Sequence, residues 1–305
     1  ALLSSGVDFK DLGLIIVDEQ HRFGVEQRDA LRAKAKTPPH LLVMTATPIP
    51  RTVAITVFGD LDISTLSELP LGRTPITTHL VNAVTKPNFV DRAWERIKEE
   101  VANGHQAYVV APRISAGTPE DADMDFLFGT QSNEMASVEE LAPKLATGAL
   151  SGLKVAPLHG RMSADDKDAT MQAFADRQLD VLVATSVIEV GVDVPNATVM
   201  VIMDADRFGI SQLHQLRGRI GRGEAAGLCL LITSAPEDSP AFARLNAVAN
   251  TLDGFELARI DLEQRREGDV LGVSQSGSRS HLKLLRVLRD EEIISQARDA
   301  AESTI

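Results

Sequence analysis

Short apolar runs that alternate with helical segments are the feature of this 305-residue chain that most constrains its fold. Continuous apolar runs are typical of strands buried on both faces of a parallel sheet. Strands that alternate with helices predict a doubly wound α/β sheet. Within residues 73–235, strands are expected at Tyr108–Ala111, Val155–Leu158, Val181–Ala184, Val199–Met203 and Leu228–Ile232. Two further runs, Leu12–Val17 and Leu41–Met44, predict part of a second such sheet in residues 1–72.

The strand pattern stops at Pro236, so residues 236–305 are expected to form a separate helical region. Residues 240–252 and 255–266 predict two helices joined by a short turn, which is a helical hairpin. A glycine-rich loop and a charged amphipathic helix over residues 281–301 follow. Residues 115–136 are acidic and poor in apolar residues, and we interpret them as an insertion between strands.

Composition excludes several classes of protein. No apolar run approaches the ~18 residues that span a bilayer, so no membrane partner is expected. The single cysteine, Cys229, lies in an apolar run and is interpreted as a core residue. A cytoplasmic protein is the simplest reading of that cysteine usage. The net charge of −12 argues against a generally basic nucleic-acid coat protein, although a local row of arginines could still contact DNA.

Polar residues follow the two expected strands of residues 1–72. Asp18 and Glu19 come directly after the first strand, at the edge where open α/β sheets bind ligands. Asp18 could hold Mg²⁺ and Glu19 could activate a water as general base, or both could belong to a polar turn. Thr45, Ala46 and Thr47 follow the second strand. The threonine hydroxyls could couple one site to another, or the segment could form an ordinary ST-turn.

An arginine-rich segment, QLHQLRGRIGRG at residues 212–223, carries Arg217, Arg219 and Arg222 among three glycines. Like charges repel, and glycine lets the backbone approach a ligand closely. The planar guanidinium group matches phosphate oxygens. The segment therefore indicates a polyphosphate site, with a solvated helix end as the alternative.

The order of these motifs resembles superfamily 2 helicases and translocases: a strand ending DEQH, a strand ending TAT, the segment ATSVIEVGVDVP and then QLRGRIGR. The resemblance implies RecA-like sheets with ATP bound between two domains. It implies Mg²⁺ binding by Asp18, water activation by Glu19, and coupling of ATP to nucleic acid by residues 45–47. It also implies a DNA-backbone contact for Thr185. Nucleotide-binding roles are implied for Gly191, Asp193, Gln215, Arg219 and Arg222, the last two as arginine fingers on the γ-phosphate.

Longer matches resemble the RecG family of bacterial branch-migration helicases, in particular residues 44–78, 204–223 and 244–277. The last of these resembles a translocation motif that RecG shares with the transcription-repair coupling factor Mfd. Arg244, Arg265 and Gln275 match the residues of that motif that couple ATP hydrolysis to movement. The resemblance implies remodelling of branched double-stranded DNA at stalled forks and Holliday junctions. An Mfd-like translocase is the runner-up.

No phosphate-loop pattern GxxxxGK[ST] occurs in the chain. RecG-like proteins carry that loop and a DNA-binding wedge domain before the DEQH strand. We therefore expect the chain to be the C-terminal part of a longer protein, with a truncated first domain. Without the loop there is no lysine and backbone cradle for the phosphates, so this polypeptide alone is expected to have little ATPase activity. A non-enzymatic DNA- or protein-binding module is the remaining alternative.

Overall fold

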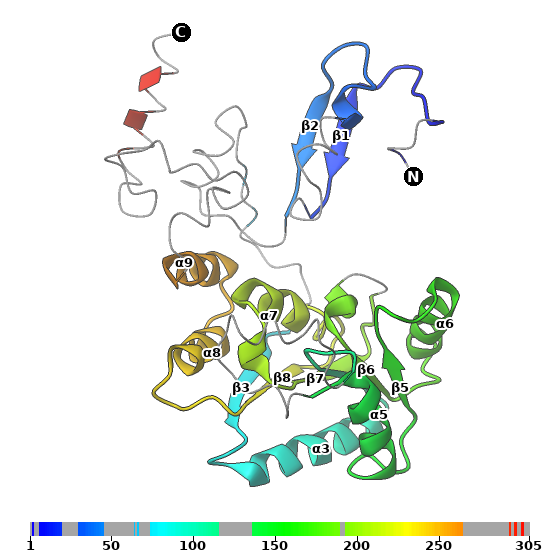
Figure 1. The fold of residues 1–305 in the computed structure, drawn as a ribbon, viewed down its shortest axis with the longest axis vertical. Coiled ribbons are helices and arrows are strands. Elements are labelled where there is room, and N and C mark those ends of the chain that lie inside the picture. Colours follow the sequence, from blue (N-terminus) through cyan, green and yellow to red (C-terminus); the bar gives the residue numbers. More distant parts are fainter. Residues whose placement is uncertain are drawn as a thin grey trace. The chain divides into compact units, whose positions relative to one another are not determined.

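The computed structural model describes residues 2, 6–19, 30–45, 64, 66, 74–115, 136–189 and 193–264, together with 293, 296, 297, 300 and 301. The chain divides into two compact units, residues 1–48 and 49–305, and each is described by itself (Figure 1). None of the helices in the described part of the chain is long and apolar enough to cross a membrane.

The first unit contains two parallel strands, β1 (Leu14–Val17) and β2 (His40–Val43). Both expected strands are therefore confirmed. Their burial is not as expected, because Leu14 and Ile16 on one face of β1 are 54% and 56% exposed while Ile15 and Val17 on the other are buried. Alternate residues point to opposite faces of a strand, so only one face of β1 is covered.

The second unit is built on a six-stranded sheet in the order β3-β8-β7-β4-β6-β5, and every pairing in it is parallel. Helices follow most of the strands, which confirms the doubly wound α/β class. The sheet strands are β3 (Ile76–Asn82), β4 (Gln106–Val110), β5 (Val155–Leu158), β6 (Val181–Ala184), β7 (Ala197–Ile202) and β8 (Gly227–Thr233). The helices are α3 (Pro87–Ala102), α5 (Val138–Thr147), α6 (Ala164–Ala175), α7 (Ile210–Arg217), α8 (Pro240–Asn250) and α9 (Gly254–Gln264), with 3₁₀ turns η3 (Ser186–Glu189) and η4 (Ala205–Arg207).

Two hydrophobic clusters lie on opposite faces of this sheet. On one face, α3 and α5 pack Trp94, Ile97 and Leu145 against alternate strand residues such as Val109 and Val201. On the other face, α6, α7, α8 and α9 pack against the intervening strand residues. The four central strands are thus apolar at nearly every position because both of their faces are buried, which is why they appear as continuous apolar runs in the sequence.

Two elements were not anticipated from the sequence. Strand β3 carries polar residues at four of its seven positions, and its first five residues alternate between half-buried and exposed, because it lies at the edge of the sheet. Helix α5 directly follows the acidic stretch and contains Pro143, which masks its helical pattern. Ser163 is the N-cap of α6: its Oγ accepts from Asp166 N at 3.1 Å and donates to Asp166 Oδ2 at 2.7 Å.

The expected helical hairpin is also present, as α8 and α9. Helix α8 packs against β3 and α7, while α9 packs against α7 (Figure 1). The core therefore continues from the sheet into the hairpin through Leu245, Val248 and Leu257. The expected domain boundary at 72/73 lies outside the described residues. So do most of the insertion and most of the C-terminal helix.

Candidate functional site

The carboxylates of the first unit lie at the carboxyl end of β1. Asp18 follows the last strand residue and its Oδ1 accepts a hydrogen bond from Glu19 N at 2.9 Å. Glu19 has a φ of 49°, a left-handed conformation that is costly for a residue with a side chain. Thr45 follows the neighbouring strand β2, so the three residues belong to the same edge of a parallel pair. Ala46 and Thr47 lie outside the described residues.

Asp18 is suited to hold a hydrated Mg²⁺, because a carboxylate is a hard oxygen ligand, and Glu19 is suited to polarise a water molecule. Among the described residues there is no group of three or more His, Cys, Asp or Glu side chains that could hold a metal by themselves. Mg²⁺ in nucleotide sites usually keeps water and phosphate oxygens as most of its ligands, so one carboxylate from the protein is a common contribution.

In the second unit, Thr185 follows β6 at the carboxyl edge of the sheet. Its backbone N–H donates to Leu158 O at 3.3 Å, which holds it beside the end of β5. His159 follows β5 at the same edge, and Arg161 donates from Nη1 to Ser115 Oγ at 2.8 Å. The carboxyl edge thus gathers hydroxyl, imidazole and guanidinium groups from segments that are far apart in the sequence.

The arginine-rich segment lies at the opposite, amino edge of that sheet. It occupies the turn between α7 and β8, and Gly221 has a φ of 64° there. A Cβ at Gly221 would lie 3.0 Å from the side chain of Ile76, the first residue of β3. The glycine is therefore required by backbone conformation and by the close approach of the turn to the sheet.

Arg222 meets Asp193 at this edge. Arg222 Nη1 lies 3.3 Å from Asp193 Oδ1, and Arg222 Nε donates to Gly218 O at 2.8 Å. These two contacts do not use Nη2, and the Arg222 side chain remains 30% exposed. Two motifs that the sequence presents separately are thus brought together, and the guanidinium group keeps a face for an anion. Gly191 lies outside the described residues.

Gln215 and Arg219 flank the same turn, Gln215 within α7 and Arg219 just after it. Both are partly buried. Burial raises the pKa of Tyr108, on β4, to about 12, and the positive charges of Arg219 and Arg222 oppose that rise.

Arg217 has a different role from its neighbours. It is 2% exposed and donates from Nη1 to Val248 O at 2.7 Å and to Thr251 O at 2.9 Å. Burial lowers its pKa. Five fixed N–H donors allow one arginine to serve two carbonyls, so Arg217 ties the end of α7 to the end of α8.

Arg244 ties the beginning of the hairpin to the opposite edge. Its Nη2 donates to Asp206 O at 2.8 Å, in the 3₁₀ turn that follows β7. Arg217 and Arg244 thus attach α8 to the sheet domain near both of its ends. Arg265 and Gln275, the other expected coupling residues, lie outside the described residues.

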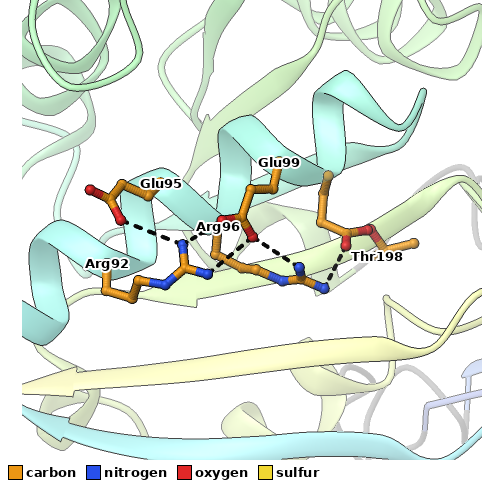
Figure 2. Close-up of polar contacts among 6 residues, drawn as sticks. Arg92, Glu95, Arg96, Glu99 and Thr198 are labelled. Atoms are coloured by element: carbon orange, nitrogen blue, oxygen red, sulfur yellow. Dashed lines mark hydrogen bonds and ion pairs between the residues drawn. The ribbon is translucent and has the colours of Figure 1, made fainter.

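A group of polar residues at the amino edge escaped sequence reasoning. Figure 2 shows the ion pairs of α3 among Arg92, Glu95, Arg96 and Glu99, and their extension to Thr198 on β7. Glu100 completes the network: it accepts from Thr198 Oγ1 at 2.7 Å and pairs with Arg96 Nη2 at 2.6 Å. The i,i+3 and i,i+4 spacing of arginine and glutamate along α3 is the sequence signal that could have indicated the ion pairs.

Comparisons with known proteins place these features in a family context. Residues 93–224 match the helicase conserved C-terminal domain, and residues 251–305 match the C-terminal part of domain 3 of the ATP-dependent DNA helicase RecG. The chain is 61% identical over 301 residues to the ATP-dependent DNA helicase RecG of Mycobacterium tuberculosis, covering 98% of this chain and 40% of that protein. The RecG of Streptococcus pneumoniae is 46% identical, with 99% of this chain and 42% of that protein covered. The chain thus spans about two fifths of the length of these relatives.

Solved structures agree with this result. A structure of RecG bound to a three-way DNA junction matches 94% of this chain and 34% of that chain, with 37% identity and a TM-score of 0.64. The Mycobacterium smegmatis helicase Lhr, bound to single-stranded DNA and AMP-PNP, matches 85% of this chain and 37% of that chain with 15% identity and a TM-score of 0.51. At that identity the likeness to Lhr supports the fold alone.

Proposed function

The chain belongs to the RecG family of DNA helicases, and on that premise we propose that it is the motor portion of an ATP-dependent double-stranded DNA translocase that remodels branched DNA. Stalled forks and Holliday junctions are the proposed substrates, in repair and recombination. One structural observation supports this most directly. The 3.3 Å contact between Asp193 and Arg222 brings together two motifs that the resemblance assigns to a single nucleotide site.

The proposed roles of the residues follow from their chemistry. Hydrolysis of ATP, in which water accepts the γ-phosphoryl group, would drive movement. Asp18 would hold Mg²⁺, and Glu19 would accept a proton from the attacking water. Arg219 and Arg222 would neutralise charge on the γ-phosphate, because a guanidinium group can donate two parallel hydrogen bonds to phosphate oxygens. Asp193 would orient Arg222 by pairing with Nη1 and leaving Nη2 to the phosphate. Gln215 and Gly191 are proposed to complete the nucleotide site.

The DNA-facing roles are proposed for the carboxyl edge and the hairpin. Thr185 would contact the DNA backbone, and Thr45, Ala46 and Thr47 would link that contact to ATP. Arg244, Arg265 and Gln275 would couple hydrolysis to movement. We also propose that residues 1–72 and 73–235 are parts of two RecA-like domains, and that residues 236–305 form the translocation motif. Because chromosomal DNA is the proposed substrate, we propose a cytoplasmic location.

The two alternatives have less support. An Mfd-like translocase would share the hairpin, but residues 251–305 match domain 3 of RecG. A non-enzymatic binding module is suggested only by the lack of a phosphate-loop pattern in this sequence. A binding module of this kind gives no reason for Arg222 to pair with Asp193 through Nη1 and leave Nη2 outside that contact.

The test compares two proteins. The full-length gene product should hydrolyse ATP in a steady-state assay, with strong stimulation by a three-way junction and weaker stimulation by linear duplex. The polypeptide of residues 1–305 should show little or no turnover under the same conditions. Normal DNA-stimulated turnover by residues 1–305 alone would refute the expected need for a phosphate loop, and a full-length product without DNA-stimulated turnover would refute the motor itself.

A further inference from the structure

The segment of residues 193–196 carries Asp193 and leads directly into β7. The arginine-rich turn rests on this segment. A Cβ at Gly223 would lie 2.7 Å from Pro195 O, so the two backbones are in direct contact. Arg222 pairs with Asp193 of the same segment. The position of Arg222 is therefore set by the position of residues 193–196.

Asn196 anchors that segment to the beginning of β4. Its Nδ2 donates to Gly104 O at 3.0 Å and to Gln106 Oε1 at 3.1 Å. Its Oδ1 lies 3.4 Å from His105 Nδ1, and its backbone oxygen accepts from Gln106 N at 3.1 Å. One short side chain thus makes contacts with three consecutive residues. Because these contacts use both its donors and its acceptor, the amide has one favoured orientation.

Gln106 holds the other side of this contact. It is 2% exposed, and its Nε2 donates to Phe174 O at 2.6 Å and to Leu179 O at 2.7 Å. Those two carbonyls fix Nε2 toward the end of α6, so Oε1 must face Asn196. Gln106 therefore connects α6, β4 and the Asp193 segment in one buried network.

The first residues of β7 are fixed from the opposite face. The register between β4 and β7 shifts here, so that Gln106 pairs with Ala197 and Ala107 with Val199. Thr198 is the extra residue, and its hydroxyl donates to Glu100 of α3 in the network that Figure 2 shows. Irregular strand pairing of this kind re-aims a chain at functional edges. The segment is held on both faces of the sheet just after it presents Asp193.

We propose that Asn196 and Gln106 are positioning residues that set the place of Arg222 at the nucleotide site. The inference rests on the proposed function. Neither residue touches the nucleotide; they act through Pro195, Asp193 and the arginine turn. Loss of the Asn196 amide releases residues 193–196 from β4, and Arg222 moves with them. A displacement of about 1 Å at a reacting group can lower turnover ~100-fold.

The experiment uses the full-length gene product with junction DNA, and the variants Asn196→Ala, Asn196→Asp and Gln106→Leu. The aspartate variant keeps the shape of the side chain but places an oxygen against Gly104 O and Gln106 Oε1. Each variant should lower kcat for ATP ~10- to 100-fold while KM for ATP changes by less than about threefold. That split is expected because these residues act on the hydrolysis step through Arg222 and not on nucleotide capture.

Asn82→Ala is the matched control. Asn82 is 4% exposed and holds Ala235 O at the carboxyl edge, with Oδ1 accepting from Val84 N and Thr85 N. Its loss should lower the melting temperature as much as Asn196→Ala does while leaving kcat within about twofold. Equal losses of kcat in the two variants would reduce Asn196 to a structural residue and overturn the proposal.

A double-mutant cycle with Arg222→Ala completes the test. If Asn196 acts through Arg222, adding Asn196→Ala to Arg222→Ala should lower kcat by less than about twofold more. Fully additive losses would overturn the proposal while leaving the motor assignment intact. A wild-type product without DNA-stimulated ATPase would overturn both, and an Arg222→Ala variant with normal turnover would overturn the finger role and this inference together.

Discussion

Arg217 Nη1, at the end of α7, lies 2.7 Å from the backbone oxygen of Val248 in α8. The same guanidinium group reaches Thr251 O at 2.9 Å, in the turn between the two hairpin helices. The helix that ends in the arginine-rich turn is therefore bonded to the hairpin by a buried charged group. Any movement of that turn is passed to the end of α8 through this contact.

Replacing Arg217 should loosen the hairpin. In Arg217→Met the buried carbonyls of Val248 and Thr251 lose a charged donor, which should cost about 1–3 kcal/mol in the free energy of unfolding. Arg217→Lys should recover only part of this, because an ammonium group cannot match the fork geometry. Hydrogen exchange over residues 248–257 and denaturant unfolding measure the effect.

The control for Arg217 is Arg92→Met. Arg92 lies on the exposed face of α3 and pairs with Glu99 at 2.8 Å. Exposed ion pairs add little to stability, so this variant should unfold like the wild type. If hydrogen exchange over residues 248–257 is the same in Arg217→Met as in the wild type, the bond does not hold the hairpin.

Replacing Arg222 should abolish hydrolysis in the full-length gene product. Arg222→Ala should lower kcat ~1,000-fold or more, as arginine fingers do in comparable enzymes, while the affinity for nucleotide falls much less. Arg222→Lys should be nearly as slow, because a lysine ammonium group lacks the planar fork that lets one guanidinium nitrogen pair with Asp193 while another donates to the phosphate. Single-turnover hydrolysis together with binding of a fluorescent nucleotide separates the two effects. Wild-type turnover in Arg222→Ala would exclude the finger role.

The hairpin and loop residues should uncouple ATP from movement. In the full-length gene product, Arg265→Ala and Gln275→Ala should keep DNA-stimulated ATPase within about threefold and lose most junction unwinding. Arg244→Ala should behave similarly, because it removes the bond to Asp206 O that attaches the start of α8 to the sheet. ATPase and unwinding are measured on the same junction. Equal losses of both activities would show that these residues serve the motor and not its coupling.

The stability of the folded protein should depend on pH through the carboxyl group of Asp204. Burial raises its pKa, although the bond from Ala136 N at 2.8 Å opposes the rise. Because the folded-state pKa is raised, this carboxyl group favours the folded state at pH values below its ordinary pKa of 3.8. This contribution to stability is lost as the pH rises through the folded-state pKa. At neutral pH the charged group therefore costs stability.

Asp204→Asn should remove that cost. Asparagine keeps an oxygen for Ala136 N and tolerates the left-handed φ of 46° at this position. The variant should be about 0.5–1 kcal/mol more stable at pH 7, and the gain should shrink as pH falls toward the folded-state pKa and below it. Thermal melting at a series of pH values measures this, with the exposed Asp91→Asn as control. A gain that does not change with pH would exclude titration of Asp204 as its cause.

Local sequence signals were sufficient for much of the fold. The strands β5 and β6 have the predicted boundaries, and the helical hairpin of α8 and α9 is present as expected. Each depends on side-chain period or on contacts within one helical turn, which a sequence displays directly. Strand β3 was missed because one of its faces is partly open at the sheet edge, which weakens its apolar pattern. Helix α5 was missed because Pro143 masks its helical pattern.

The arrangement of the candidate site depended on longer-range contacts. The sequence determined which residue types follow each strand, and its motif order indicated a superfamily 2 motor. Only the tertiary structure placed β7 between β4 and β8. The first neighbour brings Asn196 to Gln106, and the second brings Asp193 to Arg222. A strand's apolar period records that both of its faces are buried but does not record its neighbours. Those are chosen by the packing of the whole sheet, because many strand orders satisfy the same local pattern.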